Sequence, residues 1–166
     1  YVDRSKNLWI GTLGNGLNKT NLKPKKFRHY QKKVNNSFSL SENYVRTICE
    51  APLGTIWVGT LVGGLNRYDA KSDSFYHHQK TANVSPKSIN DNNVWSTCYD
   101  KELNGLWIGT NNGLDFLDFK TNTFKHYLHS EKDETSISDN TIRNVFIDKQ
   151  GSLWCGTENG LNKFDR

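Results

Sequence analysis

The 166-residue sequence lacks the features that mark several large classes of protein. No apolar run approaches the roughly 18–20 residues that a transmembrane helix needs, and no signal-peptide pattern begins at Tyr1. Long stretches with a 3.6-residue apolar period are missing, which argues against helices. The sequence has no glycine-rich phosphate loop, nucleophile elbow or zinc motif. We therefore predict no catalytic residue, no metal site, no cofactor and no nucleic-acid partner.

Cysteine is also scarce. Cys49, Cys98 and Cys155 form no CxxC pair and are odd in number, so we predict no disulfide framework and expect each to be a small buried apolar residue. Hydrophobic residues make up only 34% of the chain, yet 12% of all residues are aromatic. Few but large apolar side chains suit β-sheets, because aromatic rings fill the half-buried surface of a pleated sheet.

The formal charge of +5 is concentrated at one end of the sequence. Residues 1–33 hold nine basic residues and one acidic residue, whereas the remainder is slightly acidic. A basic end can attract an anionic partner. The alternative is a solvated outer edge, where lysines discourage unwanted strand pairing, and we favour this alternative.

A Leu/Ile-Trp-x-Gly-Thr core occurs four times and is followed each time by Gly-Leu. Its tryptophans are Trp9, Trp57, Trp107 and Trp154, which are 48, 50 and 47 positions apart. A second motif, Phe-x-His-Tyr/His, lies between the cores at residues 27–30, 75–78 and 124–127. Matching segments at one fixed period are the signature of a repeat architecture.

Each repeat predicts four short strands, which in the second repeat are residues 45–50, 55–60, 65–69 and 74–79. β-Branched and aromatic residues cluster in these runs, and Gly, Asn and Asp separate them. Strands such as residues 64–68 carry apolar groups on both faces, as expected of a sheet pressed between two neighbours. The fold class is therefore predicted to be all-β, built from antiparallel β-propeller blades. We expect the repeated tryptophan to fill the space between blades and the following glycine to leave room for the next blade.

The register of the repeat divides the chain into blade pieces at residues 1–33, 43–80, 92–129 and 140–166. These hold 14 predicted strands, or about three and a half blades, and the sequence opens in what reads as the middle of a strand. Propellers usually need at least four blades to close. We therefore expect either a fragment of a larger propeller or copies that assemble, such as a homodimer whose combined strands match a seven-bladed ring.

The pattern Ser-x-x-Asn-x-Val, then Gly-x-Leu-Trp-Ile-Gly-Thr, then Gly-Leu-Asn-Arg-Tyr-Asp resembles the two-component regulator propeller repeat. Residues 43–69 and 140–165 match it best, and the departures are Ala51-Pro52 at a turn, Cys155 for Ile, and Asp115-Phe116 for Asn-Arg. The resemblance implies the periplasmic sensor region of a hybrid histidine kinase anchored in the inner membrane. It also implies seven-bladed propellers, kinase parts elsewhere in the parent protein, and detection of oligosaccharides from glycan breakdown.

Residues that recur in every blade are interpreted as structural. This applies to the four repeated tryptophans, and to Asn43, Asn92 and Asn140, which we expect to cap the turn before the first strand of each blade. One histidine also recurs per blade, with two more nearby, and a blade-to-blade distance is too long for a shared metal site. These histidines are His29, His77 and His126, with His78 and His129 beside them.

Residues that differ between repeats are the better functional candidates. At the second position of the first strand the blades carry Arg46, Trp95 and Arg143. In a propeller this strand lines the central channel, and ligands commonly bind where loops crowd one face. Arginines and a unique tryptophan there can grip an acidic or neutral sugar by hydrogen bonds and stacking. The alternative is that both arginines pair with acidic residues of a neighbouring blade.

Three functions remain open from the sequence. The first is a non-catalytic sensor that binds an oligosaccharide and biases a kinase, and the second is a scaffold for dimerisation or protein contact. The third is a propeller lyase or glycosidase, which would need converging carboxylates. The carboxylates are nearly all predicted to lie in turns, which speaks against the enzyme; they are Asp69, Asp73, Asp118 and Asp148.

Overall fold

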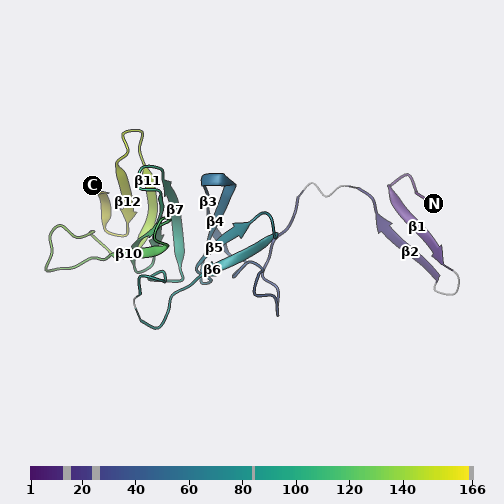
Figure 1. The fold of residues 1–166 in the computed structure, drawn as a ribbon, viewed down its shortest axis with the longest axis horizontal. Helices are drawn as coiled ribbons and strands as arrows, with labels where there is room; N and C mark the ends of the chain where they lie inside the picture. Colours follow the sequence, from purple (N-terminus) through teal and green to yellow (C-terminus); the bar gives the residue numbers. More distant parts are fainter. Residues whose placement is uncertain (13–15, 24–26, 84, 165–166) are drawn as a thin grey trace. The chain divides into compact units, whose positions relative to one another are not determined.

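The structure of the chain, a computed structural model, describes residues 1–12, 16–23, 27–83 and 85–164. The predicted all-β fold is confirmed: the described residues form thirteen strands and one short 3-10 turn (Figure 1). Tyr1–Tyr30 and Gln31–Arg166 are two compact units, each of which is described by itself. Within the described ranges, no helix is long and apolar enough to cross a membrane.

The smaller unit is a two-stranded hairpin, and the larger unit contains three antiparallel sheets. The hairpin pairs β1 (Asn7–Thr12) with β2 (Gly16–Asn21). The sheets of the larger unit are β3 (Val45–Ala51), β4 (Thr55–Thr60), β5 (Leu65–Asp69) and β6 (Ser74–His78); β7 (Val94–Asp100), β8 (Gly105–Thr110), β9 (Gly113–Asp118) and β10 (Thr123–Tyr127); and β11 (Ile142–Ile147), β12 (Leu153–Thr157) and β13 (Gly160–Phe164). In each sheet, strands that follow one another in sequence are hydrogen-bonded neighbours, as in a propeller blade.

One predicted strand does not form. Residues 27–30 were expected to be the outer strand of the first blade, but they have no regular secondary structure, and Phe27 is 87% exposed. The equivalent Phe75 and Phe124 are each 5% exposed, and each donates its backbone N–H to a loop carbonyl. Phe27 therefore lacks the buried aromatic contact that holds β6 and β10 in place. The prediction of a fourteenth strand at residues 27–30 is wrong.

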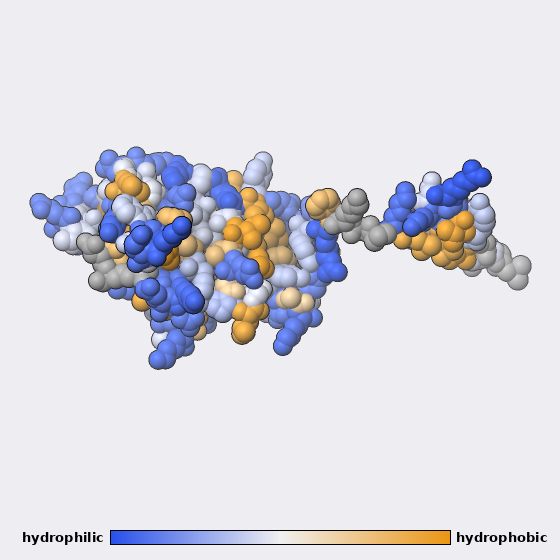
Figure 2. Space-filling view, turned by 90° about the horizontal axis from the view of Figure 1, so that it is seen from above, coloured by the Kyte–Doolittle hydropathy of each residue, from blue (hydrophilic) through white to orange (hydrophobic). Residues whose placement is uncertain are grey.

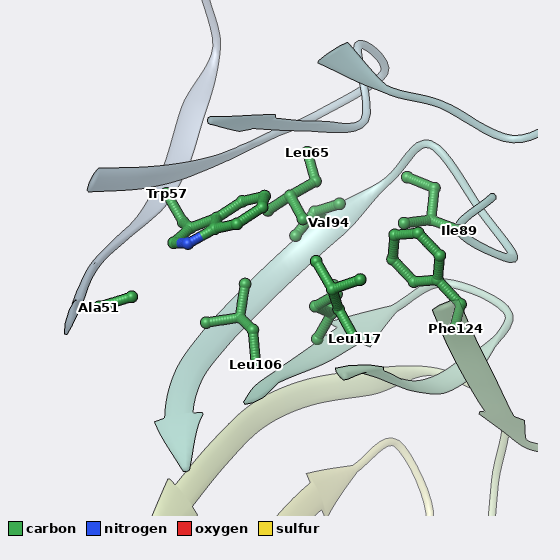
Figure 3. Close-up of a cluster of buried hydrophobic side chains, with 9 residues drawn as sticks. Ala51, Trp57, Leu65, Ile89, Val94, Leu106, Leu117 and Phe124 are labelled. Atoms are coloured by element: carbon green, nitrogen blue, oxygen red, sulfur yellow. The ribbon is translucent and has the colours of Figure 1, made fainter. Parts of the chain in front are cut away.

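The sheets of the larger unit pack face to face, and their first strands β3, β7 and β11 lie side by side. One core cluster joins Ala51, Trp57 and Leu65 of the first sheet to Val94 and other apolar residues of the next (Figure 3). A second cluster lies between the next two sheets and includes Trp107. The tryptophan of one blade thus packs against the following blade, as the repeat predicted.

The glycine of the repeat sets the distance between neighbouring sheets. A Cβ placed on Gly59 would lie 2.5 Å from Val94 Cγ1, and a Cβ on Gly109 would lie 2.9 Å from Ile142 Cγ2. Real Cβ atoms essentially never approach so closely, so the absence of a side chain is what allows β7 to approach β4 and β11 to approach β8. The expectation that this glycine leaves room for the next blade is confirmed.

Hydrogen bonds between first strands add to this packing and were not anticipated from the sequence. Thr47 Oγ1 on β3 accepts the backbone N–H of Thr97 on β7 at 3.1 Å. One blade further on, Ser96 Oγ accepts the backbone N–H of Val145 on β11, also at 3.1 Å. Small hydroxyl residues at equivalent positions therefore link each first strand to the next.

Apolar side chains also remain on the surface of the larger unit. Ile48 on β3 and Phe146 on β11 are exposed. Figure 2 shows apolar patches among hydrophilic side chains on this unit. A stack of sheets that each need two neighbours leaves one uncovered face on its first sheet and one on its last.

Candidate ligand-binding site

The three candidate residues occupy equivalent places on the first strands of the three sheets. Arg46 is the second residue of β3, Trp95 of β7 and Arg143 of β11. The strand pairing shifts register across each of these positions, between Val45 and Thr47 and at the equivalent places in β7 and β11. Each candidate is thus the extra residue of a β-bulge, a device that re-aims a side chain and recurs next to functional sites.

The bulges bring the three side chains together in one stack. The guanidinium carbon of Arg46 lies 3.4 Å from the centroid of a Trp95 ring, and that of Arg143 lies 3.8 Å from a Trp95 ring centroid. The arginines come from the blades on either side of Trp95, so they cover opposite faces of the indole. Trp95 Nε1 donates to Asn111 Oδ1 at 2.9 Å, which fixes the ring in its plane.

The stack is accessible to solvent. Arg46 and Arg143 are exposed and Trp95 is half-buried, so the three side chains are not consumed by packing between blades. Arg143 forms an ion pair with Glu158, which belongs to its own blade rather than a neighbouring one. The arrangement therefore presents the N–H edges of two guanidinium groups beside one carboxylate, with a net positive charge.

Coverage of both Trp95 faces changes how a ligand can bind. A sugar ring can stack on this indole only after one guanidinium moves away. Hydrogen-bonding to the guanidinium edges needs no such rearrangement, and planar guanidinium groups bind carboxylate or sulfate oxygens well. In the state that the structure shows, the site favours an anionic group over a neutral stacked ring.

The repeated tryptophans lie elsewhere: Trp57 and Trp107 between the sheets, Trp154 on the last sheet and Trp9 in the hairpin. Trp57 and Trp107 are buried, and Trp9 and Trp154 are half-buried. In three repeats an aspartate accepts the indole N–H, as in the bond of 2.9 Å from Trp107 Nε1 to Asp100. Hydrogen bonds lower the pKa of Asp148, with that from Trp154 contributing most. The Asp–Trp spacing of six or seven residues is present in the sequence and is the signal that predicts this bond.

The histidines form separate local contacts. Within the described ranges, no group of three potential metal ligands occurs. His77 bonds to the carbonyl of Ser39 at 2.7 Å. His126 Nδ1 lies 2.7 Å from the buried carboxyl of Asp115, and this hydrogen bond raises the pKa of His126. Asp115 also accepts the backbone N–H of Asn90.

Asp115 holds the position that asparagine occupies in the neighbouring blades. Asn66 and Asn162 each accept a backbone N–H from the loop before the first strand, as Asp115 does. The third blade has Asp115-Phe116 where the repeat has Asn-Arg. A carboxyl that binds a histidine therefore replaces the neutral amide acceptor. The loop contact is the same in all three blades.

The remaining polar candidates serve turns. Asp69 and Asp118 accept backbone N–H groups two residues later, at 2.8 and 2.7 Å, and these bonds lower the pKa of both carboxyls. Asn92 Oδ1 accepts the N–H of Lys80, which ties the loop before β7 to the end of the preceding blade. Turn carboxylates held in this way are ionised acceptors and not paired acid–base catalysts.

All three cysteines are free thiols. Cys155 is buried as expected, and burial raises the pKa of its thiol to about 12. Cys49 and Cys98 are only partly buried, so the expectation of full burial is wrong for these two. Both lie on first strands, Cys49 in β3 and Cys98 in β7, and partial burial raises the pKa of both thiols.

Comparison with known proteins identifies the repeat. The sequence model of the family described as "two component regulator propeller" matches residues 39–61 and 136–159. These segments are similar to two component regulator propeller repeats. The matches cover the loop, first strand and Trp-Gly-Thr core of the second and fourth blades, which confirms the resemblance seen in the sequence. No curated protein gave a match to the chain.

One solved structure supports the same assignment. The extracellular domain assigned to the hybrid two component system BT3049 from B. thetaiotaomicron is 26% identical, with a TM-score of 0.70 over 99% of this chain. That of BT4673 from the same organism is 22% identical, with a TM-score of 0.45 over 96% of the chain. The chain spans 21% and 26% of these two domains. The likeness to BT3049 supports a sensor-propeller role and is consistent with a place outside the cytoplasm.

Proposed function

We propose that this chain is part of a periplasmic sensor propeller that binds an acidic oligosaccharide at Arg46, Trp95 and Arg143. Binding there biases a histidine kinase in the parent protein, which is anchored in the inner membrane. The segment itself is not an enzyme. The likeness to an extracellular domain of a hybrid two component system supports the sensor role.

The stack of Arg46, Trp95 and Arg143 is the observation that carries the proposal. Three neighbouring blades each contribute one residue. The residue type at this position differs between blades, whereas the Trp-x-Gly-Thr core is the same in all of them. Each sits in a bulge that directs it out of the regular ladder. A purely structural position would be expected to carry similar residues in every blade, as the repeated tryptophan does.

The charge of the stack indicates the class of oligosaccharide. Two arginines face one acidic partner, Glu158, so an added anion finds a local excess of positive charge. Hydrogen bonds to charged groups contribute about 1.5–3 kcal/mol each. A uronic acid or a sulfated sugar supplies such an anion, whereas a neutral sugar supplies only hydroxyl groups.

Thermal shift and calorimetric titration with an oligosaccharide panel test the proposal. The panel pairs uronic-acid or sulfated oligosaccharides with neutral oligosaccharides of the same length. A ligand at about 100 times its Kd stabilises the folded chain by about 2.7 kcal/mol, which raises the melting temperature. We expect the acidic members alone to do this, with the effect decreasing as salt increases.

Variants separate this site from a diffuse charge effect. We expect Arg46→Ala and Arg143→Ala each to weaken binding about 10- to 100-fold, since each removes an interaction of about 1.5–3 kcal/mol. Lys101→Ala is the matched control, because it removes an exposed positive charge from the turn at the far end of β7. Equal losses for all three variants would contradict the proposal.

The rival functions give different results in the same experiments. If no oligosaccharide raises the melting temperature and the chain self-associates in a concentration-dependent manner, the scaffold is favoured instead. If an acidic oligosaccharide is shortened or modified during incubation, the chain is an enzyme. Either result would refute the sensor proposal in its present form.

A further inference from the structure

The second blade lacks the acceptor that the other blades give to their repeated tryptophan. Asp3, Asp100 and Asp148 accept the indole N–H of their own blade at 2.8–2.9 Å. In the second blade Ala51 holds this place, six residues before Trp57. Among the described residues, Trp57 Nε1 is the only buried side-chain nitrogen or oxygen without a hydrogen-bond partner.

A positively charged residue lies on the same face of the sheet as this unpaired donor. Arg67 on β5 is directly opposite Trp57 on β4 in the strand pairing, so the two side chains share one face of the sheet. The fourth blade has the same arrangement with its aspartate present: Lys163 is opposite Trp154, and both lower the pKa of Asp148. The second blade therefore keeps the N–H donor and the cation of this arrangement but lacks the anion.

A cleft of about 490 Å³ opens at this place, between the first two sheets of the larger unit. Its lining includes Ala51, Trp57, Arg67, Tyr76, His78 and Phe119, and no acidic residue among those that the structure describes. Burial lowers the pKa of His78, so this imidazole is neutral at neutral pH. The cleft thus combines aromatic walls with the permanent positive charge of arginine.

The unpaired N–H is directed toward the missing carboxylate. The nitrogen edge of the Trp57 ring lies on the side of Ala51 (Figure 3), and Trp57 is only 4% exposed. Pro52 and Leu53 of the 3-10 turn η1 (Pro52–Gly54) line the same cleft, and a ligand reaches the buried nitrogen only if its surroundings shift. In that turn Leu53 has φ 61° and a fully exposed side chain, a backbone conformation that is unfavourable for leucine.

We propose that this cleft binds a small carboxylic acid with an apolar body. The carboxylate takes the place of the missing aspartate, where it accepts the N–H of Trp57 and pairs with Arg67. The apolar body packs against the aromatic walls, to which Tyr76 and Phe119 belong. This site belongs to the cleft between two sheets and is independent of the stack formed by Arg46, Trp95 and Arg143.

Indole N–H signals in ¹⁵N-labelled protein give a direct test. Benzoate is the probe, and benzyl alcohol is its neutral counterpart; Trp57→Phe identifies the Trp57 signal. We expect benzoate to shift that signal with a Kd in the millimolar range, about 1 mM. The Trp107 and Trp154 signals should stay in place because their N–H groups already bind aspartate.

Two substitutions address the carboxylate position itself. Ala51→Asp supplies the acceptor from within the chain, so benzoate should no longer move the Trp57 signal. Arg67→Gln should weaken binding by at least about tenfold, which corresponds to about 1.4 kcal/mol. Lys101→Ala, which removes an exposed positive charge outside both sites, should leave the benzoate-induced shift of the Trp57 signal unchanged. Because that signal reports on the cleft alone, its outcome is separate from that of the proposed sensor function.

The proposal is overturned if benzoate at about ten times that Kd leaves the Trp57 signal unmoved. It is also overturned if Ala51→Asp binds benzoate as the original chain does, since the two carboxylates would then not compete for one place. An equal shift with benzyl alcohol would show an apolar cleft that does not recognise a carboxylate, and would likewise overturn it.

Discussion

The aspartate that accepts the tryptophan N–H offers a direct test of how the blades are stabilised. In the third blade Asp100 is 1% exposed and accepts Trp107 Nε1 at 2.9 Å and the backbone N–H groups of Glu102 and Leu103 at 3.0 Å. Substitution Asp100→Ala removes all three bonds at once. It also recreates in this blade the arrangement that Ala51 gives to the second blade.

The expected loss follows from the burial of the donor. Trp107 is fully buried, so its N–H finds no water after the substitution, and an unsatisfied buried group costs about 1–3 kcal/mol. The two turn N–H groups are partly exposed and regain water, so they add less. We therefore expect Asp100→Ala to lower the free energy of unfolding by about 3 kcal/mol. Asp100→Asn, which keeps an acceptor, should cost about 1 kcal/mol.

Urea unfolding followed by tryptophan fluorescence and circular dichroism measures these differences. The slope with urea should stay unchanged, because the surface exposed on unfolding is the same. In a thermal melt a loss of 3 kcal/mol corresponds to about 6–12 °C for a chain of this size. Asp133→Ala is the control, since this exposed loop carboxylate also binds a turn N–H but serves no buried donor.

Two outcomes would refute the reasoning. If Asp100→Asn is as damaging as Asp100→Ala, the acceptor is not what stabilises the blade. If Asp100→Ala costs no more than Asp133→Ala, the buried N–H is not penalised in this protein. The reverse substitution, Ala51→Asp, should raise the free energy of unfolding by about 1 kcal/mol, since it satisfies an existing orphan donor.

Two further predictions concern blade spacing and pH. Gly59→Ala should destabilise the chain by about 1–3 kcal/mol, because its Cβ would lie 2.5 Å from Val94. Gly156→Ala, whose nearest atom would be 3.7 Å away, should be close to neutral, and equal losses would refute the spacing argument. The pair of His126 with Asp115 raises the pKa of His126 above 6.5, so its stabilisation is complete below that value and is lost as pH rises through the folded-state pKa. Urea unfolding at pH values from below 6.5 upward should show the free energy of unfolding decreasing as the pH rises. His126→Gln should remove this pH dependence.

The strands inside complete blades could be predicted from the sequence, two of the four in the second blade to the residue. The predicted segments 55–60 and 65–69 coincide with β4 and β5, and the segments 45–50 and 74–79 differ from β3 and β6 by one residue each. Local signals suffice there, because turn residues bound each run and the pairing partners are neighbours in sequence. Residues 27–30 carry the same local motif but form no strand, since Phe27 is not buried against a sheet. Burial is a property of the surroundings, which the motif does not contain.

The candidate site could be predicted only as a set of positions. Arg46, Trp95 and Arg143 stood out because they break the repeat, and the structure brings them into one stack. The bulges that aim them and the coverage of both indole faces depend on register and rotamers, which sequence spacing does not determine. The unpaired N–H of Trp57 could not be predicted in the same way. The alanine at position 51 that leaves it unpaired is visible in the sequence. That an aspartate at this position binds the tryptophan N–H is seen only in the structures of the other blades.

If the stack binds a ligand as proposed, its three residues connect that binding to the contact between blades. Arg46 lies one residue before Thr47, whose hydroxyl accepts an N–H from β7, and Trp95 lies one residue before Ser96, which does the same toward β11. A ligand that holds the two arginines therefore acts on three sheets at the point where they are hydrogen-bonded to one another. Such a ligand can shift the balance between two arrangements of the blades only by binding one more tightly than the other. Because one contact comes from each blade, a change in blade spacing alters all three contacts together, and this is the source of the differential affinity that the proposed sensor function requires.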